Sequence, residues 1–269
     1  MLTLKNLLGS SCEFNHLLIE TTGIADPSGI VDAFITGKTI QQKFRIDSVV
    51  CLADAVNMED LFDEQPEVRK QLALSDLVLL NKTDRIGQEQ VGRLTELIRS
   101  VNPMAKIYPA TFGDVAEIEI LDTHSFSGEA IGKSALSFCR MDISGDDRSG
   151  EKSFVHHPQR NQVFHQHDIS SVGFTFKGNF DVNKFGVWMQ NFLYFNQDTI
   201  FRVKGIMSFD QTEDRFVFHA VRSFFMFEVG KAWDEEERFS KLVFIGKNIS
   251  GKELEVNLLQ LLVKEDATI

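Results

Sequence analysis

Three closely spaced polar residues, Asn81, Lys82 and Asp84, form an N-K-x-D pattern, the clearest sign of chemistry in this sequence. They follow the apolar run 77–80, and a short apolar run bounded by polar residues is typical of a strand buried on both faces of a parallel sheet. Such sheets bind ligands beyond the carboxyl ends of their strands. A guanine base has two adjacent N–H donors that the Asp84 carboxylate can accept together, the Lys82 stem can lie along the purine plane, and Asn81 can tie neighbouring loops together. The pattern favours guanine recognition, and the alternative is an ordinary polar loop after a strand.

The composition is that of an ordinary globular protein. The 269 residues are 43% hydrophobic and 25% charged, which is enough for two domains with a sizeable core. The net charge of −11 argues against non-specific binding to nucleic acid or anionic membranes, because both require a positive field. The cysteines are few and widely spaced, no run approaches the roughly 20 apolar residues of a membrane span, and the first residues lack a signal-peptide pattern. We therefore expect a cytoplasmic protein with no nucleic-acid or membrane partner.

The first part of the chain alternates predicted strands with helical segments. Strands are expected at 16–20, 48–52, 77–80 and 105–108, and an amphipathic helix is expected at 91–101. This alternation indicates βαβ units and therefore a mainly parallel sheet. Because the carboxyl ends of parallel strands share one edge of the sheet, the polar residues there would lie together: Glu20, Gly23, Asp26, Asp54, Asn81, Lys82, Asp84 and Thr111.

Glu20 and Gly23 follow the first predicted strand. A glutamate at a strand tip can hold a magnesium-bound water or a nucleophilic water, and a glycine lets the backbone approach a γ-phosphate closely. The alternative for Glu20 is an ordinary charged strand end. Only the presence of the N-K-x-D pattern in the same sequence makes the catalytic interpretation the better one.

The segments IETTGIADP (19–27) and LLNKTD (79–84) together resemble the CobW-type GTPases, metal-insertion chaperones related to the hydrogenase- and urease-maturation GTPases. Downstream, IFRVKGIM (200–207) and KLVFIG (241–246) are similar to strands of the C-terminal domain of that family. The resemblance covers nearly the whole chain. It implies a GTP-dependent metal chaperone that delivers zinc, cobalt or a similar ion to a client metalloprotein.

The same resemblance implies GTP and Mg2+ as cofactors and Zn2+ or Co2+ as the transported metal. It places Glu20 and Gly23, the catalytic candidates, in the magnesium and γ-phosphate region. The nucleotide-binding candidates are Asn81, Lys82, Asp84 and Thr111.

A GTPase of this type also needs a P-loop, G-x-x-x-x-G-K-[ST], whose amides cradle the phosphates while its Lys and Ser/Thr reach the β/γ oxygens and magnesium. Gly37-Lys38-Thr39 has the required ending, but Asp32 stands where the first glycine belongs and a predicted helix precedes it. The stretch Gly128–Ser134 is one residue too short and follows a polar loop. Neither has the strand–loop–helix context that aims backbone amides at phosphate.

The absence of a recognisable P-loop leads to three expectations about this chain. The sequence looks N-terminally truncated, without the first β–P-loop–α unit. The polypeptide alone should bind GTP weakly and hydrolyse it negligibly, and a partner chain that supplies the P-loop is one hypothesis for an active GTPase. The alternative function is a non-hydrolysing remnant, or an interaction and metal-binding protein that needs a partner chain.

Residues 126–168 have the composition of a flexible linker, rich in Gly, Ser, Asp and Lys. Neutral imidazoles suit zinc, nickel, copper and cobalt, and histidine-rich linkers occur at this place in CobW-type proteins. We interpret the histidines here as transient metal ligands; the alternative is a solvated linker enriched in histidine by drift. The metal candidates are His156, His157, His165 and His167.

The pattern changes again beyond residue 168. The phenylalanines between 216 and 227 are expected to be core rather than a partner surface, and Ser250 with Glu253 forms a capping box that opens a last helix. Strands are predicted at 171–177, 200–209, 215–227 and 241–245, and a further helix is predicted at 180–195.

These elements define the predicted fold class, α/β. A P-loop-type domain with a mainly parallel sheet, incomplete in its first unit, occupies residues 1–125. The flexible histidine-containing linker is 126–168, and a small α+β C-terminal domain with helices on one face of a mainly antiparallel sheet is 169–269.

Overall fold

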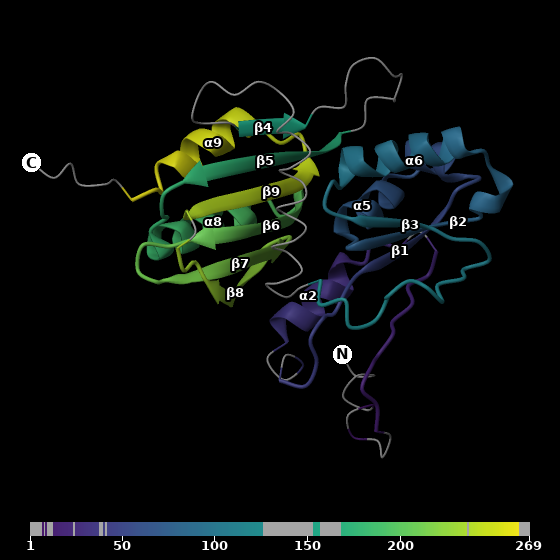
Figure 1. Ribbon diagram of the computed structural model, residues 1–269, viewed down its shortest axis with the longest axis horizontal. Coiled ribbons are helices and arrows are strands. Elements are labelled where there is room, and N and C mark those ends of the chain that lie inside the picture. Colours follow the sequence, from purple (N-terminus) through teal and green to yellow (C-terminus); the bar gives the residue numbers. More distant parts are fainter. Residues whose placement is uncertain are drawn as a thin grey trace, which may run out of the picture.

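Two β-sheets lie side by side in the computed structural model (Figure 1). The first has three strands in the order β1-β2-β3, all parallel, and the second has six strands in the order β4-β5-β9-β6-β7-β8, all antiparallel. This architecture confirms the predicted α/β fold with a second, antiparallel part. The structure describes residues 7, 9, 13–23, 25–37, 40, 42–125, 153–156, 168–235 and 237–263.

The parallel sheet consists of β1 (Val50–Asp54), β2 (Leu77–Asn81) and β3 (Lys106–Pro109). β2 lies in the middle, with a strand paired on each side, and its four leucine and valine residues are all buried, as in a sheet covered on both faces. The apolar run before N-K-x-D therefore forms the doubly buried strand that the sequence predicts.

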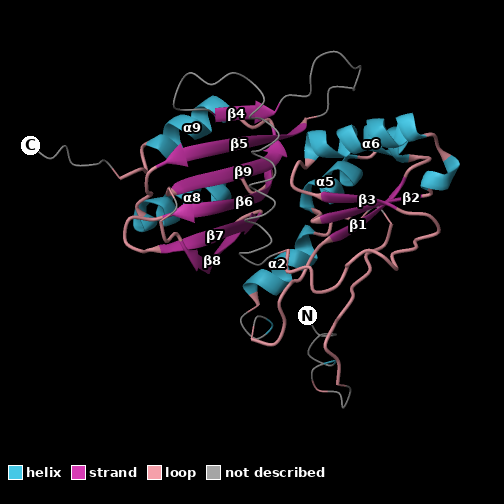
Figure 2. Ribbon diagram, viewed as in Figure 1, coloured by secondary structure: helices cyan, strands magenta, loops and turns pink. Residues whose placement is uncertain are grey.

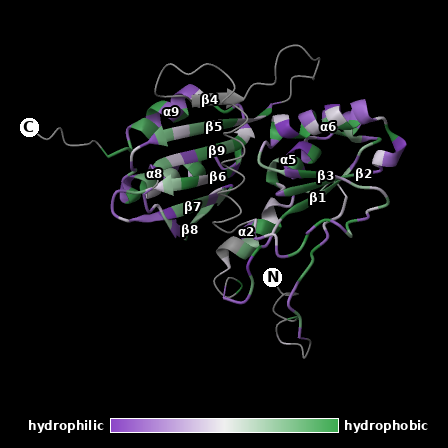
Figure 3. Cartoon of the chain, in the orientation of Figure 1, coloured by the Kyte–Doolittle hydropathy of each residue, from purple (hydrophilic) through white to green (hydrophobic). Residues whose placement is uncertain are grey.

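The helices of this part of the chain, among the described residues, are α2 (Ser28–Thr36), α4 (Met58–Glu64), α5 (Pro66–Leu74) and α6 (Gln88–Val101). α6 has the predicted amphipathic pattern, with Leu94, Ile98 and Val101 fully buried and hydrophilic positions visible along the helix (Figure 3). None of the described helices is both long and apolar enough to cross a membrane.

The first predicted strand, 16–20, is not a strand. This segment has no regular secondary structure, and Leu18 and Ile19 are 72% and 45% exposed. An extended segment becomes a strand only when its backbone groups pair with a neighbour, and no backbone hydrogen bond joins 16–20 to β1 in the described part of the chain. The apolar pattern alone therefore did not produce a strand, because no pairing partner for this segment is present among the described residues.

The antiparallel sheet consists of β4 (Ser153–His156), β5 (Ile169–Lys177), β6 (Ile200–Ser208), β7 (Asp214–Val221), β8 (Phe224–Ala232) and β9 (Phe239–Lys247). Two helices, α8 (Val182–Phe195) and α9 (Gly251–Leu259), lie on the same face of it (Figure 2). The Asp181 carboxylate caps α8, and the Ser250 hydroxyl accepts the Glu253 amide of α9 at 3.4 Å, as the capping-box pattern predicts.

The predicted strand 215–227 is in fact two strands, β7 and β8, that form a hairpin. Arg222 takes the left-handed conformation, with φ of 51°, at the reversal between Val221 and Phe224. The prediction was wrong because Arg-Ser is not one of the turn pairs, such as Asn-Gly, that favour positive φ and mark a hairpin in a sequence.

β6 is buried on both faces, and the two faces differ in chemistry. Val203 and Met207 face an aromatic core that includes Phe218 and residues of α8 and α9. In this core the rings of Phe185 and Phe218 pack edge to face at 5.5 Å. The predicted core role is confirmed for the phenylalanines at 216, 218, 225 and 227, whereas Phe224 is 38% exposed.

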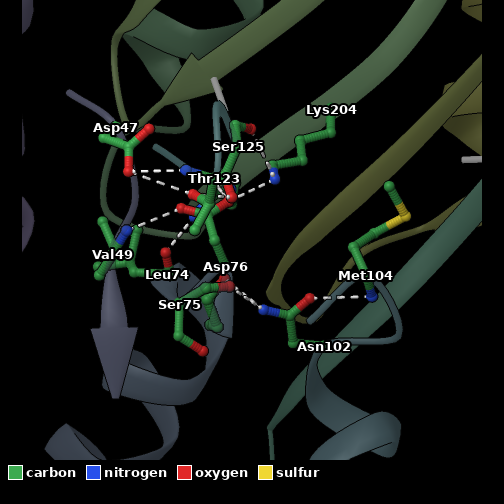
Figure 4. Close-up of polar contacts among 12 residues, drawn as sticks. Asp47, Val49, Leu74, Ser75, Asp76, Asn102, Met104, Thr123, Ser125 and Lys204 are labelled. Atoms are coloured by element: carbon green, nitrogen blue, oxygen red, sulfur yellow. Dashed lines mark hydrogen bonds and ion pairs between the residues drawn. The ribbon is translucent and has the colours of Figure 1, made fainter. Parts of the chain in front are cut away.

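A buried ion cluster on the other face of β6 joins the two sheets (Figure 4). Oδ1 of Asp76, the residue just before β2, lies 2.5 Å from Nη2 of Arg202 and 2.5 Å from Nζ of Lys204. Oδ2 of Asp76 accepts the Val49 amide, just before β1, at 3.0 Å. The cluster therefore fixes the amino ends of β1 and β2 against β6.

Backbone carbonyls complete the cluster. Nη1 of Arg202 donates to the Leu74 carbonyl at the end of α5, where the helix dipole favours a cation. Nζ of Lys204 lies 3.5 Å from the Ser125 carbonyl, and the Asn102 side chain donates to two further carbonyls at the end of α5, each at 2.8 Å. The carboxyl end of α5 is thus held by side chains from both parts of the chain.

Two cations, Arg202 and Lys204, share the Asp76 carboxylate, and burial disfavours their charged forms. Burial, reinforced by the neighbouring Arg202 guanidinium, lowers the pKa of Lys204 to about 8, although Asp76 opposes the shift. His219, which lies opposite Lys204 in the β6–β7 register, has a pKa lowered by burial and by the same two cations, so that it stays neutral.

Replacement of Asp76 by asparagine should destabilise the fold by about 3–5 kcal/mol, because two buried cations would lose their counter-ion. Chemical denaturation of wild type and variant measures the loss. Asp54→Asn is the matched control, since Asp54 pairs with a lysine that is 43% exposed and exposed pairs contribute at most about 1 kcal/mol. Equal losses in the two variants would contradict the role of Asp76.

The stability of the wild type should rise with pH, relative to Lys204→Met, between about pH 8 and pH 10.5. In this window the unfolded lysine, with its ordinary pKa of 10.5, binds more protons than the folded one. The relative gain approaches about 1.4 kcal/mol per pH unit at most. Urea denaturation at several pH values measures it, and parallel pH curves for the two proteins would contradict the burial of a charged Lys204.

Candidate functional site

The carboxyl ends of the parallel strands bring the N-K-x-D residues next to the loop after β3. Oδ1 of Asn81 accepts the Gly113 amide at 2.9 Å. The backbone amide and the hydroxyl of Thr83 both donate to the Ala110 carbonyl, at 3.2 Å and 3.0 Å. Residues 110–113 and the N-K-x-D loop are therefore fastened to each other at two points, and Thr111 lies between those points.

Lys82 pairs with Asp54, a residue at the end of β1 that stands opposite Asn81 in the strand register. Nζ of Lys82 lies 2.8 Å from Oδ2 of Asp54, which also accepts the Asn57 amide group at 2.9 Å, while its Oδ1 accepts the Val56 amide. Partial burial opposes ionisation of Asp54, but these hydrogen bonds outweigh it and lower the pKa of the carboxyl. Lys82 has φ of 64°, so its backbone turns sharply just where β2 ends.

Asp84 lies in the short 3-10 helix η1 (Thr83–Arg85) and is exposed. No hydrogen bond or ion pair with another described residue engages its carboxylate, so both oxygens are available to an incoming donor. Phe112 lies on the neighbouring loop, is 94% exposed and has φ of 53°. A carboxylate, a lysine stem and an exposed ring beside one sheet edge suit a flat heteroaromatic ring that carries N–H donors.

The Glu20–Gly23 segment is held by a helix of the parallel part. The side-chain amide of Gln71, on α5, donates to the Gly23 carbonyl at 3.0 Å and to the Ala25 carbonyl at 2.7 Å. Glu20 and Gly23 are both exposed. Among the described residues no hydrogen bond links Glu20 to the N-K-x-D loop, so the two groups of candidates are not brought into contact.

Asp26 follows this segment and forms the contacts that the sequence did not suggest. Its Oδ1 accepts the Ser28 amide at 2.9 Å, and its Oδ2 lies 2.7 Å from Nη2 of Arg222. Partial burial raises the pKa of Asp26, but the hydrogen bonds with Ser28 and the charges of Arg222 and Lys70 outweigh that effect and lower it.

The predicted metal ligands are mostly outside the described residues. His156 ends β4, and His157, His165 and His167 lie in the stretch that the structure does not describe. Within the described ranges, no group of three or more His, Cys, Asp or Glu side chains can hold a metal ion. The Cys51 thiol on β1 has its pKa raised to about 12 by burial, so it is protonated at neutral pH and is a poor ligand.

One of the two P-loop-like stretches can be placed. Gly37 directly follows α2, so its G-K-T sequence comes after a helix and not after a strand. Lys38, Thr39 and the stretch 128–134 lie outside the described residues.

Three residues of this region were not among the candidates selected from the sequence: Gln71, Phe112 and Arg222. Gln71 and Arg222 lie far along the chain from the loop that they contact, and single polar residues in a helix or at a turn carry no signal of such a contact. Phe112 follows the predicted last strand of the sheet. Its position directly after Thr111 is the one sequence feature that could have marked it as a site residue.

The fold and this edge define an α/β nucleotide-binding domain joined to an antiparallel α+β domain. Residues 1–109 match the CobW/HypB/UreG nucleotide-binding domain, and residues 169–262 match the C-terminal domain of the cobalamin synthesis protein CobW. The chain therefore belongs to the CobW/HypB/UreG family, as the motifs at 19–27 and 79–84 predicted.

Several characterised proteins are homologous to this chain. The zinc chaperone YjiA of Escherichia coli (strain K12) is 27% identical over 93% of this chain and 72% of its own length. Zinc-regulated GTPase metalloprotein activator 1 of Schizosaccharomyces pombe is 25% identical over 91% of this chain and 64% of its own length. The crystal structure of the Zn(II)-bound YjiA GTPase from E. coli matches 97% of this chain and 75% of that chain with a TM-score of 0.73 at 25% identity. The chain thus spans only part of the length of each relative.

Proposed function

We propose that this chain is a GTP-dependent metal chaperone that passes zinc, or a similar ion such as cobalt, to a client metalloprotein. The observation that carries the proposal is the exposed Asp84 carboxylate at the carboxyl edge of the parallel sheet, beside Lys82 and the loop that Asn81 fixes. Relatives named as a zinc chaperone and a zinc-regulated GTPase metalloprotein activator support the metal.

In the proposed complex, Asp84 accepts the two N–H groups of guanine and the Lys82 stem covers one face of the base. Asn81 and Thr83 hold the loop that contains Thr111 and Phe112, and this loop lies against the ring from the β3 side. Glu20 would hold or orient a water near the γ-phosphate, and Gly23 would allow close approach of the backbone. When bound, Mg2+ supplies positive charge that offsets the charge developing on the phosphate oxygens.

The phosphate-binding half of the proposed site depends on a P-loop. Gly37 follows a helix, and in the sequence the stretch 128–134 follows a polar loop, so we propose that residues 1–269 alone bind GTP weakly and hydrolyse it negligibly. A partner chain that supplies a P-loop would complete the site. Among the described residues β1 is one of the two edge strands of its sheet, and its Val50 and Leu52 are 40% and 64% exposed, which suits the docking of an added strand.

We propose that the chain is divided into residues 1–125, 126–168 and 169–269, and that the histidines of the middle segment collect the metal. A non-hydrolysing protein that binds metal or partners is the second candidate. The exposed β1 edge favours this second candidate if the chain functions only in a complex with a partner.

Asp84→Ala should weaken binding of a fluorescent guanine nucleotide by about 10- to 100-fold, because it removes the acceptor of two charge-assisted hydrogen bonds worth about 1.5–3 kcal/mol. Asp114→Ala is the control, since Asp114 is an exposed carboxylate on the nearby loop after β3. Fluorescence titration, with competition by GDP and by ADP, measures the effect. Equal competition by the two nucleotides, no effect of Asp84→Ala, or rapid phosphate release by the chain alone would count against the proposal.

Replacement of His156, His157, His165 and His167 by alanine should weaken zinc binding by about ten-fold or more, since loss of even indirect metal contacts costs that much. Competition with a chromogenic chelator measures the affinity. The control variant replaces the exposed histidines His16 and His124 and should bind zinc like the wild type. Unchanged affinity in the fourfold variant would place zinc elsewhere and remove the proposed metal-collecting role.

A further inference from the structure

The loop that follows Glu20 and Gly23 is tied to the antiparallel sheet by an ion pair. Oδ2 of Asp26 lies 2.7 Å from Nη2 of Arg222 and 3.8 Å from Nζ of Lys70. The side chains of these three residues are each only about a quarter exposed, at 26%, 27% and 24% respectively. The pair is therefore better shielded from water than an ordinary surface ion pair.

Arg222 is itself held firmly in the sheet. It stands at the reversal between β7 and β8, and its backbone amide donates to the Phe201 carbonyl of β6 at 3.2 Å. Val221, its neighbour on β7, is buried in the core that both sheets share. α2, which begins two residues after Asp26, packs against β7 and β8 (Figure 1). The backbone of Arg222 is thus fixed in the antiparallel sheet while its guanidinium contacts the loop.

The opposite side of the loop is held by α5. The Gln71 side chain donates to the carbonyls of Gly23 and Ala25, and Lys70, the preceding residue of α5, faces Asp26. Only two residues separate Gly23 from Asp26, so the Gln71 contact and the Arg222 contact act on positions that are close along the chain. The loop therefore lies between two contacts, one from each part of the chain.

We infer that Arg222 is a positioning residue: through Asp26 it holds the loop at Gly23, Ala25 and Asp26 and couples that loop to the antiparallel sheet. A ligand that moves the loop must then stretch or break the Asp26–Arg222 pair, and a change in the antiparallel sheet must in turn alter the loop, because such coupling is reciprocal. The relevance of the loop to the γ-phosphate rests on the proposed function, whereas the coupling itself does not.

Amide hydrogen exchange of the full chain without nucleotide tests the coupling. Arg222→Gln should make the amides of residues 21–29 exchange about five-fold faster, the change expected for loss of an ion pair worth about 1 kcal/mol. Asp26→Asn keeps an oxygen for the Ser28 amide and should have the same effect. The double variant should exchange no faster than either single variant, because both substitutions remove the same interaction. Arg222→Lys should retain most of the protection.

Arg238→Gln is the matched control, since Arg238 pairs with Glu213 within the antiparallel part and makes no hydrogen bond or ion pair with the described residues of the loop. It should leave exchange at 21–29 unchanged. Unchanged exchange in Arg222→Gln, additive effects in the double variant, or an equal effect of Arg238→Gln would overturn the inference. Because every measurement is made without nucleotide, a failure of the chain to bind GTP would refute the proposed function and leave this result intact.

Discussion

The Asp76 carboxylate is the contact on which the arrangement of the two sheets depends. It accepts a hydrogen bond from the Val49 amide just before β1, and it lies directly before β2. It also forms ion pairs with both Arg202 and Lys204 of β6. Burial makes each of these charges costly unless it is paired, so the cluster allows one relative placement of the sheets and penalises others. The two cations exceed the single anion, and the surplus is accommodated by backbone carbonyls and by the lowered pKa of Lys204.

This cluster also positions the candidate site, which lies at the other end of the same strand. β2 has only five residues, from Leu77 to Asn81, and it is buried between two parallel neighbours. Asp76 fixes its amino end, and the Asn81 and Thr83 contacts fix the loop at its carboxyl end. The antiparallel sheet therefore acts as part of the support for the candidate site, and through Arg222 it also contacts Asp26 in the segment that follows Glu20 and Gly23.

The elements that the sequence predicted well are those in which a local pattern and the final environment agree. β2, the amphipathic α6 and the capped start of α9 each contain their signal within a few residues. The segment 16–20 has an apolar pattern but no described pairing partner, and the β7–β8 turn has no sequence mark because Arg222 adopts positive φ in a context where glycine or asparagine is usual. The face of β6 that carries Arg202 and Lys204 gave no indication of burial, because charged residues at alternate positions normally indicate a solvated face.

The sequence by itself determined the family, the parallel and antiparallel halves, and the N-K-x-D residues, because short motifs and periodic apolar runs are local properties of the chain. Only the tertiary structure decided which distant groups meet: Asp76 with β6, Lys82 with Asp54, and Asp26 with Arg222. The physical reason is that an ion pair between residues far apart in sequence leaves no periodic trace. Its energy depends on the separation and burial that the packed sheets impose.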